Sequence, residues 1–482
     1  MKSRLIAISL SICFAFANAE AKLELRQPCS DGMVLQQNCD AVIWGCATPG
    51  SAITVTPSWS GISIQTQTDA SGSWTVLAKT PEASYHPYSI EVKGDGMSLT
   101  INDVLVGEVW FASGQSNMDI TMHGYYNCPI EDANPYIANP PGADRVRMYT
   151  EPIAASYEAV ERGSGYWKRG NSEGVWDMSA VAFFFAEQLN RSLNVPVGII
   201  CCAYGGSRVE SWIPERQLRE WGSEDLSRER IEAMTDYHRP FKAYNAMFNP
   251  IAGYTVKGFI WYQGCSNVGA HDEYVEHMEW LIGHWRSRFG DDEAELPFYL
   301  VEIAPYTYSA DGEGIDGALL RDEQHKLCHK VPNCGIVVTN DLVEEYEKTN
   351  IHPAKKREIG ERLSWLALNR QYGFTKLACN SPEALSVFIP KGREYAIGVK
   401  LSNIPNGMDR MEGIEGLEVL SSEGNWVKAR SISSAWPDDF IIINTPEVRN
   451  PVAVRYGWGD FKPGNLHNAE GLPLSPFNLS IK

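Results

Sequence analysis

The chain has 482 residues, of which 44% are hydrophobic and 21% charged, a globular composition that excludes a disordered or collagen-like protein. This length is typical of about two to four domains. The net charge of −18 at pH 7 argues against binding to nucleic acid, to anionic membrane surfaces or to strongly polyanionic substrates.

Residues 1–19 have the pattern of a secretory signal peptide. Lys2 and Arg4 precede an apolar run, residues 5–16, that is too short to span a bilayer, and Ala-Asn-Ala at 17–19 fits a cleavage site. The alternative is a short anchor or a buried segment. Cleavage would change the net charge to −20, since it removes two basic and no acidic residues. We predict secretion across the inner membrane to the periplasm or the extracellular space. No later apolar run is long enough for membrane insertion.

Ten cysteines remain after such a cleavage, and they are scattered along the chain. They form no CxxC pair and have no histidine at metal-ligand spacing, so we expect neither a metal nor a cofactor. An oxidising compartment permits disulfides, and Cys328 and Cys334 could close a short loop. Cys201 and Cys202 lie in an apolar run that favours buried thiols.

Both ends of the mature chain are predicted to be β-rich. Residues 20–105 contain short strand-like runs separated by turn residues, which predicts a small β-sandwich. Residues 376–482 return to short strands, the clearest at 416–420, 440–443 and 452–456. They predict a second β unit that could pack against the first.

Between them, residues 106–375 alternate apolar strands with helical segments. Strands buried on both faces and separated by helices predict an α/β domain with a doubly wound parallel sheet in three layers. The expected strands are 106–112, 197–203, 256–262, 297–303 and 335–339. The expected helices are 178–194, 274–289 and one from Pro353 to about Asn369, because proline suits a first helical turn.

Four polar segments follow predicted strands: 114–118, 205–212, 261–267 and 350–353. Ligand sites of parallel sheets form beyond the carboxyl ends of the strands. Each segment alone is ordinary loop chemistry. Together they supply a serine, a histidine and oxyanion donors, which is the set that acyl transfer requires.

These segments read GQSNM, GGSxxExW, WYQG and IHP, and in this order they resemble the four blocks of SGNH hydrolases. The variant is similar to the bacterial sialate O-acetylesterases and related acetylxylan esterases. Residues 30–37, 454–458, 465–468 and 471–477 resemble the opening and closing segments of that family. The resemblance implies a flavodoxin-like SGNH domain flanked by N- and C-terminal β domains. It also implies cofactor-free hydrolysis of O-acetyl esters on a mono- or oligosaccharide.

By this resemblance, Ser116 is the nucleophile and His352 is the general base and then the general acid. The oxyanion hole would combine the N–H of Ser116, the N–H of Gly205 or of Gly206, and the side chain of Gln263. The implied substrate-binding residues are Gln115, Asn117, Gly206, Arg208, Glu210 and Trp212. Packing and salt-bridging of the loop is the alternative role of the last three.

Three positions depart from the family pattern. Thr349 and Asn350 stand where relatives often carry the acid that orients the histidine, and Cys265 stands where a glutamate is usual. Either a Ser–His dyad works with a neutral acceptor, or a distant acid substitutes. The candidate acids are Asp341, Glu344 and Glu345. The change at Cys265 bears on substrate choice.

The alternative to an esterase is an inactive esterase fold that binds carbohydrate. Asn350 and Cys265 favour it, whereas the intact Ser116, Gln263 and His352 disfavour it. A lipase or peptidase would require activity on long-chain esters or peptides, and no apolar lid is evident in the sequence.

Overall fold

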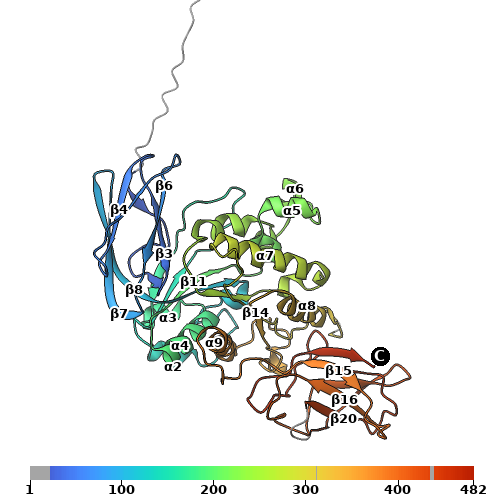
Figure 1. Cartoon of the computed structure of the whole chain (residues 1–482). Helices are drawn as coiled ribbons and strands as arrows, with labels where there is room; N and C mark the ends of the chain where they lie inside the picture. Colours follow the sequence, from blue (N-terminus) through green and yellow to red (C-terminus); the bar gives the residue numbers. More distant parts are fainter. Residues whose placement is uncertain (1–21, 311, 435–438, 482) are drawn as a thin grey trace, which may run out of the picture.

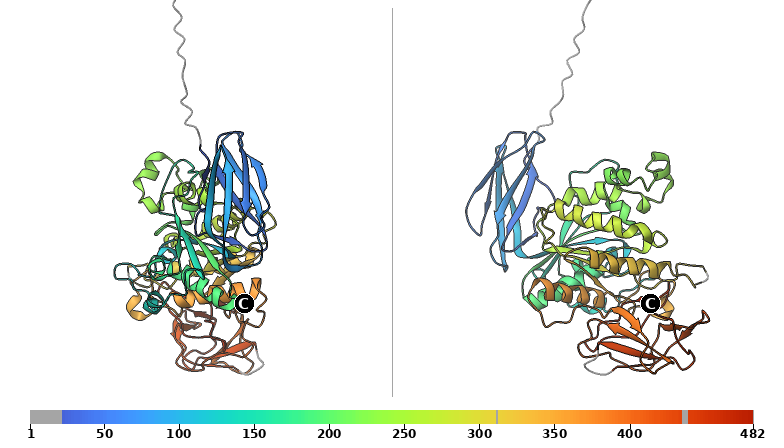
Figure 2. Two further views of the ribbon diagram at one scale, coloured as in Figure 1. Left: turned by 90° about the vertical axis from the view of Figure 1, so that its left-hand side faces the viewer. Right: turned by 45° about the vertical axis from the view of Figure 1, so that its right-hand side comes forward.

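The computed structural model describes residues 22–310, 312–434 and 439–481, so the predicted signal peptide lies outside the described residues. Figures 1 and 2 show an N-terminal β domain, a central α/β domain and a C-terminal β domain. The two β domains lie on opposite sides of the central one in these views. The expectation that the second β unit could pack against the first is therefore wrong.

The N-terminal domain contains two layers of strands. One is the antiparallel sheet of β1 (Glu24–Leu25), β3 (Asp40–Cys46) and β6 (Ser73–Lys79). The other comprises β2 (Val34–Gln36), β4 (Ala52–Pro57), β5 (Ile64–Gln67), β7 (Ser84–Gly94) and the first half of β8 (Met97–Gly114). Strand β8 then continues into the central sheet, so the two domains share one strand.

The central sheet has the order β10-β9-β11-β8-β12-β13-β14. These are β10 (Tyr166–Arg169), β9 (Val146–Thr150), β11 (Val197–Ala203), β12 (Gly258–Tyr262), β13 (Phe298–Val301) and β14 (Cys334–Val337), with β8 in the middle. All neighbours pair in parallel except β10, which is antiparallel at the edge. The predicted parallel sheet is thus present inside a mixed sheet. The order β11-β8-β12-β13-β14 is flavodoxin-like.

Helices cover both faces of this sheet. Successive side chains of β8 point to opposite faces: Trp110 packs on Phe185 of α4 (Ala180–Leu193), and Phe111 packs on Trp285 of α7 (Tyr274–Arg288). The first face also carries α9 (Arg357–Gln371), and α8 (Asp316–Lys330) packs beside α7. Shorter helices are α1 (Ser116–Asp119), α2 (Ala133–Ala138), α3 (Ser172–Trp176), α5 (Glu215–Trp221) and α6 (Arg228–Ala233). Within the described ranges, no helix is long and apolar enough to cross a membrane.

Helix α9 begins four residues later than the sequence predicts. Pro353 lies in a loop, and the helix starts at Arg357. The reason is a side chain from outside the segment: the Glu347 carboxylate accepts the backbone N–H of Ala354 at 2.9 Å. This bond holds the chain after His352 in a loop.

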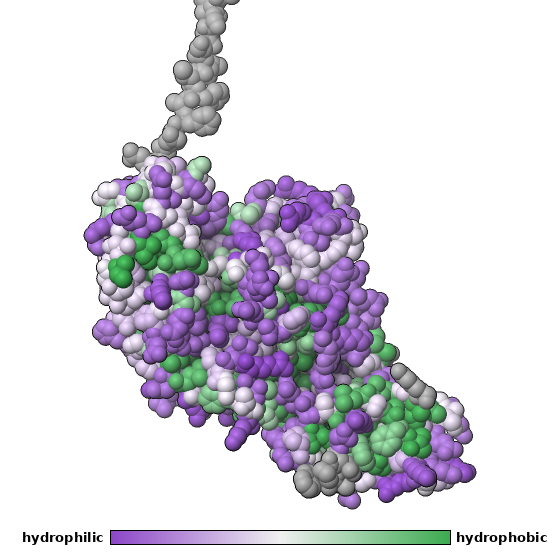
Figure 3. All heavy atoms as spheres, viewed as in Figure 1, coloured by the Kyte–Doolittle hydropathy of each residue, from purple (hydrophilic) through white to green (hydrophobic). Residues whose placement is uncertain are grey.

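The C-terminal domain consists of two antiparallel four-stranded sheets. One contains β15 (Ala384–Phe388), β16 (Ala396–Leu401), β20 (Phe440–Asn444) and β19 (Ile432–Ser433). The other contains β18 (Trp426–Lys428), β17 (Leu417–Leu420), β21 (Ala453–Tyr456) and β22 (Phe477–Ser480). Apolar side chains also reach its surface, among them Leu385 and Ile389, and Figure 3 shows apolar surface on this domain.

Candidate active site

The strand register brings three of the four predicted segments to the same level. Gly114, the last residue of β8, pairs with Ala203 of β11 on one side and with Tyr262 of β12 on the other. Gly114 has φ +136°, and a Cβ there would lie 2.2 Å from the Tyr262 carbonyl oxygen, so only glycine fits. The sheet therefore ends at the same level in front of three segments, which carry Ser116, the 205–207 turn and Gln263.

Gly205 is the glycine that faces the serine. A Cβ built on Gly205 would lie 3.5 Å from Cβ of Ser116, whereas one on Gly206 would meet the ring of Tyr237 at 2.6 Å. Within the described chain, the backbone N–H groups of Ser116 and Gly205 donate to no other protein group. Two N–H groups are thus available beside the Ser116 hydroxyl.

Asn117 connects the serine segment to the histidine loop. Its Nδ2 donates to the carbonyl of Ile351 at 2.9 Å, and its Oδ1 accepts from Nζ of Lys356 at 2.6 Å. These two partners lie on either side of His352 in the sequence. Because Asn117 is fully buried, it acts as a link between the two loops and not as a substrate contact.

The His352 ring has one free nitrogen. Its Nε2 is buried and has no hydrogen-bond partner, while Nδ1 lies 3.7 Å from Sγ of Cys128. Burial, together with the nearby charge of Lys356, lowers the pKa of His352 to about 4. The imidazole is therefore neutral near pH 7, which is the form that can accept a proton.

Lys356 is a buried cation behind this site. Burial lowers its pKa to about 7, although the nearby carboxylate of Glu347 opposes that shift. Burial also raises the pKa of the Cys265 thiol, although Tyr308, Lys356 and Arg321 oppose that rise. Cys265 thus lies within the electrostatic influence of two buried cations, Lys356 and Arg321. A cysteine at this position supplies no carboxylate to pair with them.

Gln263 is oriented away from the role expected of it. Its amide nitrogen donates to the carbonyl of Ser207 at 3.1 Å and to Oδ1 of Asn267 at 2.7 Å. An amide has only two N–H donors, so both are used within the protein. The structure therefore gives Gln263 the role of a brace for the glycine turn, and it does not offer the expected third oxyanion donor.

Most of the implied substrate-binding side chains are buried. Gln115 is 2% exposed and accepts the N–H of Gly264, and Trp212 is fully buried and donates to Ser207. Glu210 binds Nδ1 of His277 at 2.9 Å, and Arg208 forms a partly buried ion pair with Glu224. For Gln115 and Trp212 the substrate role is contradicted by burial. For Arg208 and Glu210 the ion pairs favour the packing alternative.

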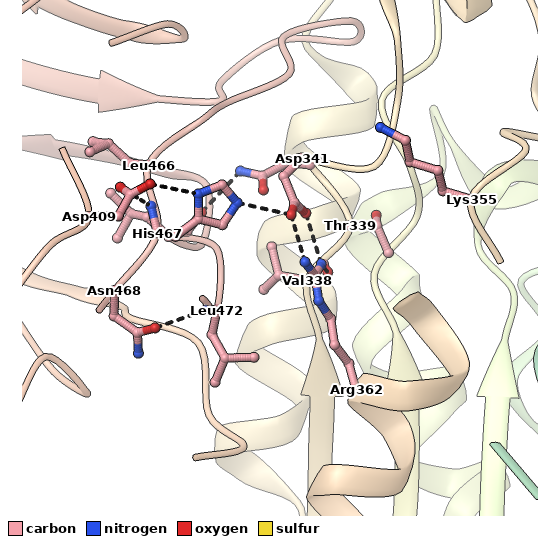
Figure 4. Close-up of polar contacts among 12 residues, drawn as sticks. Val338, Thr339, Asp341, Lys355, Arg362, Asp409, Leu466, His467, Asn468 and Leu472 are labelled. Carbon is pink, nitrogen blue, oxygen red and sulfur yellow. Dashed lines mark hydrogen bonds and ion pairs between the residues drawn. The ribbon is translucent and has the colours of Figure 1, made fainter. Parts of the chain in front are cut away.

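None of the three candidate acids hydrogen-bonds to His352. Asp341 binds Arg362 through both oxygens and His467 through one, as Figure 4 shows. Burial would raise its pKa, but Arg362 and His467 outweigh burial and hold that pKa at about 2. Glu344 pairs with Lys355 and Glu345 with Lys348. The expectation of a substitute acid among them is wrong in this structure.

Four residues of the site were missed in the sequence. Cys128 contacts the imidazole nitrogen, and the Tyr125 ring packs edge-on against His352 at 5.4 Å. Asp119, whose pKa burial raises, accepts the Tyr125 hydroxyl at 2.6 Å. Lys356 follows His352 by four residues in the same loop, so its closeness in the sequence could have been noticed. No local pattern marks Cys128.

Fold and site together define an SGNH-type ester hydrolase, with a serine and a histidine segment at the carboxyl edge of a flavodoxin-like sheet. Residues 106–369 match the family of carbohydrate esterases described as sialic acid-specific acetylesterases. The chain belongs to this family, and the resemblance read from the four motifs is confirmed.

Similar proteins support the same assignment. The human sialate O-acetylesterase is 28% identical over 396 residues, which cover 75% of this chain and 74% of that protein. The mouse sialate O-acetylesterase is 26% identical over 513 residues, covering 93% of each. A crystal structure of a carbohydrate acetylesterase from Xanthomonas citri has a TM-score of 0.82 and 30% identity, covering 95% of this chain and 100% of that one. The protein is a carboxylic ester hydrolase of the sialate O-acetylesterase type.

Proposed function

We propose that this chain is an exported carbohydrate O-acetylesterase in which Ser116 is the nucleophile and His352 the general base. The observation that carries the proposal is the Asn117 link, which ties the serine helix to the loop of His352. It is supported by the unpartnered Nε2 of a neutral imidazole, an atom free to accept the serine proton.

In the proposed reaction, Ser116 Oγ attacks the carbonyl carbon of an acetyl ester while Nε2 of His352 takes the hydroxyl proton. The carbonyl oxygen becomes an oxyanion, which the N–H groups of Ser116 and Gly205 stabilise. Collapse breaks the bond to the sugar oxygen, and His352 returns the proton to that oxygen. Water, activated by the same histidine, then converts acetyl-Ser116 to acetate.

The substrate we propose is a small acetylated sugar. The similar proteins are named as sialate O-acetylesterases and a carbohydrate acetylesterase. The acidic net charge of −18 disfavours long polyanionic chains as substrates. Export to the periplasm or the extracellular space rests on the signal-like residues 1–19, and mass spectrometry of the N-terminus after expression tests it.

The central experiment measures acetate release by the full-length protein. Substrates are p-nitrophenyl acetate, O-acetylated sialic acid and acetylated xylan fragments. Ser116→Ala and His352→Ala should each lose at least about 10³-fold in kcat. Ser60→Ala, an exposed serine of the N-terminal domain, is the matched control and should act like the wild type. Sugar binding without turnover that depends on Ser116 would favour a carbohydrate-binding protein instead.

A further inference from the structure

We propose that Cys128 is a positioning residue for His352, occupying the place beside Nδ1 that a carboxylate holds in a serine triad. This inference rests on the proposed function, because it assigns the partner of its general base.

The contacts fix the direction of both hydrogen bonds. Cys128 Sγ lies 3.4 Å from Oδ1 of Asn350 and 3.7 Å from Nδ1 of His352. An amide oxygen only accepts, so the thiol hydrogen points to Asn350 and the sulfur is left to accept Nδ1–H. Hydrogen on Nδ1 leaves the lone pair on Nε2, the unpartnered atom that the proposed reaction uses.

The turn that carries Cys128 is closed by two backbone hydrogen bonds. Tyr125 and Cys128 exchange backbone hydrogen bonds of 3.0 and 2.9 Å. Gly124 has φ +77°, and a Cβ there would lie 2.4 Å from the Cys128 carbonyl oxygen, so the turn requires glycine. The thiol is therefore held at a set place by the backbone.

The same turn touches the imidazole from a second side and is attached to the serine helix. The Tyr125 ring meets His352 edge-on at 88°, and its hydroxyl donates to Asp119, the last residue of α1. The turn of Tyr125 and Cys128 thus contacts both helix α1 and the His352 ring.

Other groups near the ring do not fill this place. Asn350 Oδ1 already accepts the backbone N–H of His352 at 3.0 Å. Lys356 is the charged group that acts on the ring, and a cation opposes the imidazolium that forms during attack. Tyr125 offers its ring edge. Among the described residues, the hydrogen-bond acceptor at Nδ1 is the Cys128 sulfur.

A thiol stabilises the imidazolium less than a carboxylate, so its removal should cost less than the roughly 10⁴-fold of a triad aspartate. We expect Cys128→Ala to lower kcat about 10- to 30-fold with KM unchanged, as a lost neutral hydrogen bond and tautomer control would do. Cys128→Ser keeps a donor and an acceptor and should recover at least half of the wild-type kcat. Cys39→Ala is the matched control, because Cys39 is also a half-buried thiol but lies in the N-terminal domain.

Nitrogen-15 NMR of the imidazole measures the tautomer of His352, which loss of packing alone would not change. In wild type and Cys128→Ser, His352 should be the Nδ1–H tautomer at pH 7, and in Cys128→Ala the Nε2–H form should gain population. The His352 signal is assigned by its loss in His352→Ala. A kcat of Cys128→Ala within twofold of wild type, or an equal loss in Cys128→Ser, overturns the inference.

Ser116→Ala and His352→Ala are measured in the same series. If both keep the wild-type rate, the proposed function fails. If both lose it and Cys128→Ala does not, only the role of Cys128 fails.

Discussion

His467 of the C-terminal domain donates Nε2–H to the carboxylate of Asp341 in the catalytic domain, at 3.1 Å. On its other side, Nδ1 of His467 lies 3.4 Å from Asp409. A histidine with a carboxylate at each ring nitrogen is favoured in its protonated form, because both nitrogens must donate. The hydrogen bond to Asp341 raises the pKa of His467 despite burial. The domain boundary thus contains a charge-dependent contact.

This contact predicts a stability that depends on pH. The raised pKa of His467 stabilises the protein below the unfolded value of about 6.5, and the effect is lost as pH rises through the folded value. Because the pKa of Asp341 is lowered to about 2, this carboxylate stabilises the folded protein above about pH 4. That stabilisation is lost as the pH falls toward 2. His467→Ala should therefore reduce stability by up to about 1 kcal/mol near pH 5.5.

Scanning calorimetry at pH 5.5 and 8.5 checks this. The gap in unfolding midpoint between wild type and His467→Ala should be larger at pH 5.5. His86→Ala, at an exposed histidine of the N-terminal domain, is the control and should show no such difference. An equal gap at both pH values would exclude the charged contact.

Asn350 predicts a second outcome, because it occupies a position where relatives often have an acid. Its Oδ1 accepts the N–H of His352 and the thiol of Cys128. Asn350→Asp retains both contacts and adds a negative charge near the imidazole, so kcat should be kept or raised and the pKa of His352 should increase. Asn350→Ala should lose about 10-fold in kcat, less than His352→Ala. A pH–rate series on p-nitrophenyl acetate measures both, and a loss in Asn350→Asp as deep as in Asn350→Ala would contradict the prediction.

Cys265 offers a test of the buried cations. Two of Arg321's nitrogens, Nε and Nη1, are buried without a hydrogen-bond partner, and Lys356 is fully buried as well. A carboxylate at 265 could pair with them, so Cys265→Asp should be more stable than the isosteric Cys265→Asn by about 1–3 kcal/mol at pH 7. Urea unfolding compares the two variants. Equal stability would show that neither cation reaches position 265.

Cys328 and Cys334 predict a covalent outcome. Their sulfur atoms lie 3.3 Å apart, between the end of α8 and the start of β14. In an oxidising compartment we expect them to form a disulfide, each thiol losing one hydrogen to a disulfide oxidant by exchange. Peptide mass spectrometry without reductant should find the 328–334 link in exported protein. If both thiols are free and react rapidly with an alkylating reagent under native conditions, the predicted disulfide is contradicted.

The strands of the catalytic domain could be predicted because their signal is local. The seven-residue apolar run Val197–Ala203 is strand β11 without any shift, since a strand buried on both faces reads as continuous hydrophobic sequence. The start of α9 could not be predicted, because the Glu347 carboxylate, seven positions before Ala354, accepts the backbone N–H of that residue.

That the segments of Ser116 and His352 belong to one site could be predicted from motifs, but the contacts that support them could not. Cys128 and His352 are 224 positions apart, and only the folded turn brings them together. The orientation of the Gln263 amide depends likewise on Ser207 and Asn267. Motif spacing identifies which loops meet at a sheet edge, whereas hydrogen-bond direction is decided by tertiary packing.

The pH dependence of the reaction should reveal the charge of Lys356. A general base works only when neutral, so kcat/KM should fall below the pKa of His352, which burial and Lys356 lower to about 4. Lys356 has a pKa of about 7 and is therefore charged throughout the acidic range in which it acts. In Lys356→Met the charge is gone, the pKa of His352 should rise, and the acidic limb should move to higher pH.

The rate at pH 8 reports any structural damage from losing the contact with Asn117, and the position of the limb reports the charge alone. Lys355→Met is the matched control, because Lys355 is the neighbouring residue but pairs with Glu344. If the limb of Lys356→Met stays where the wild type has it, the buried ammonium does not tune the base.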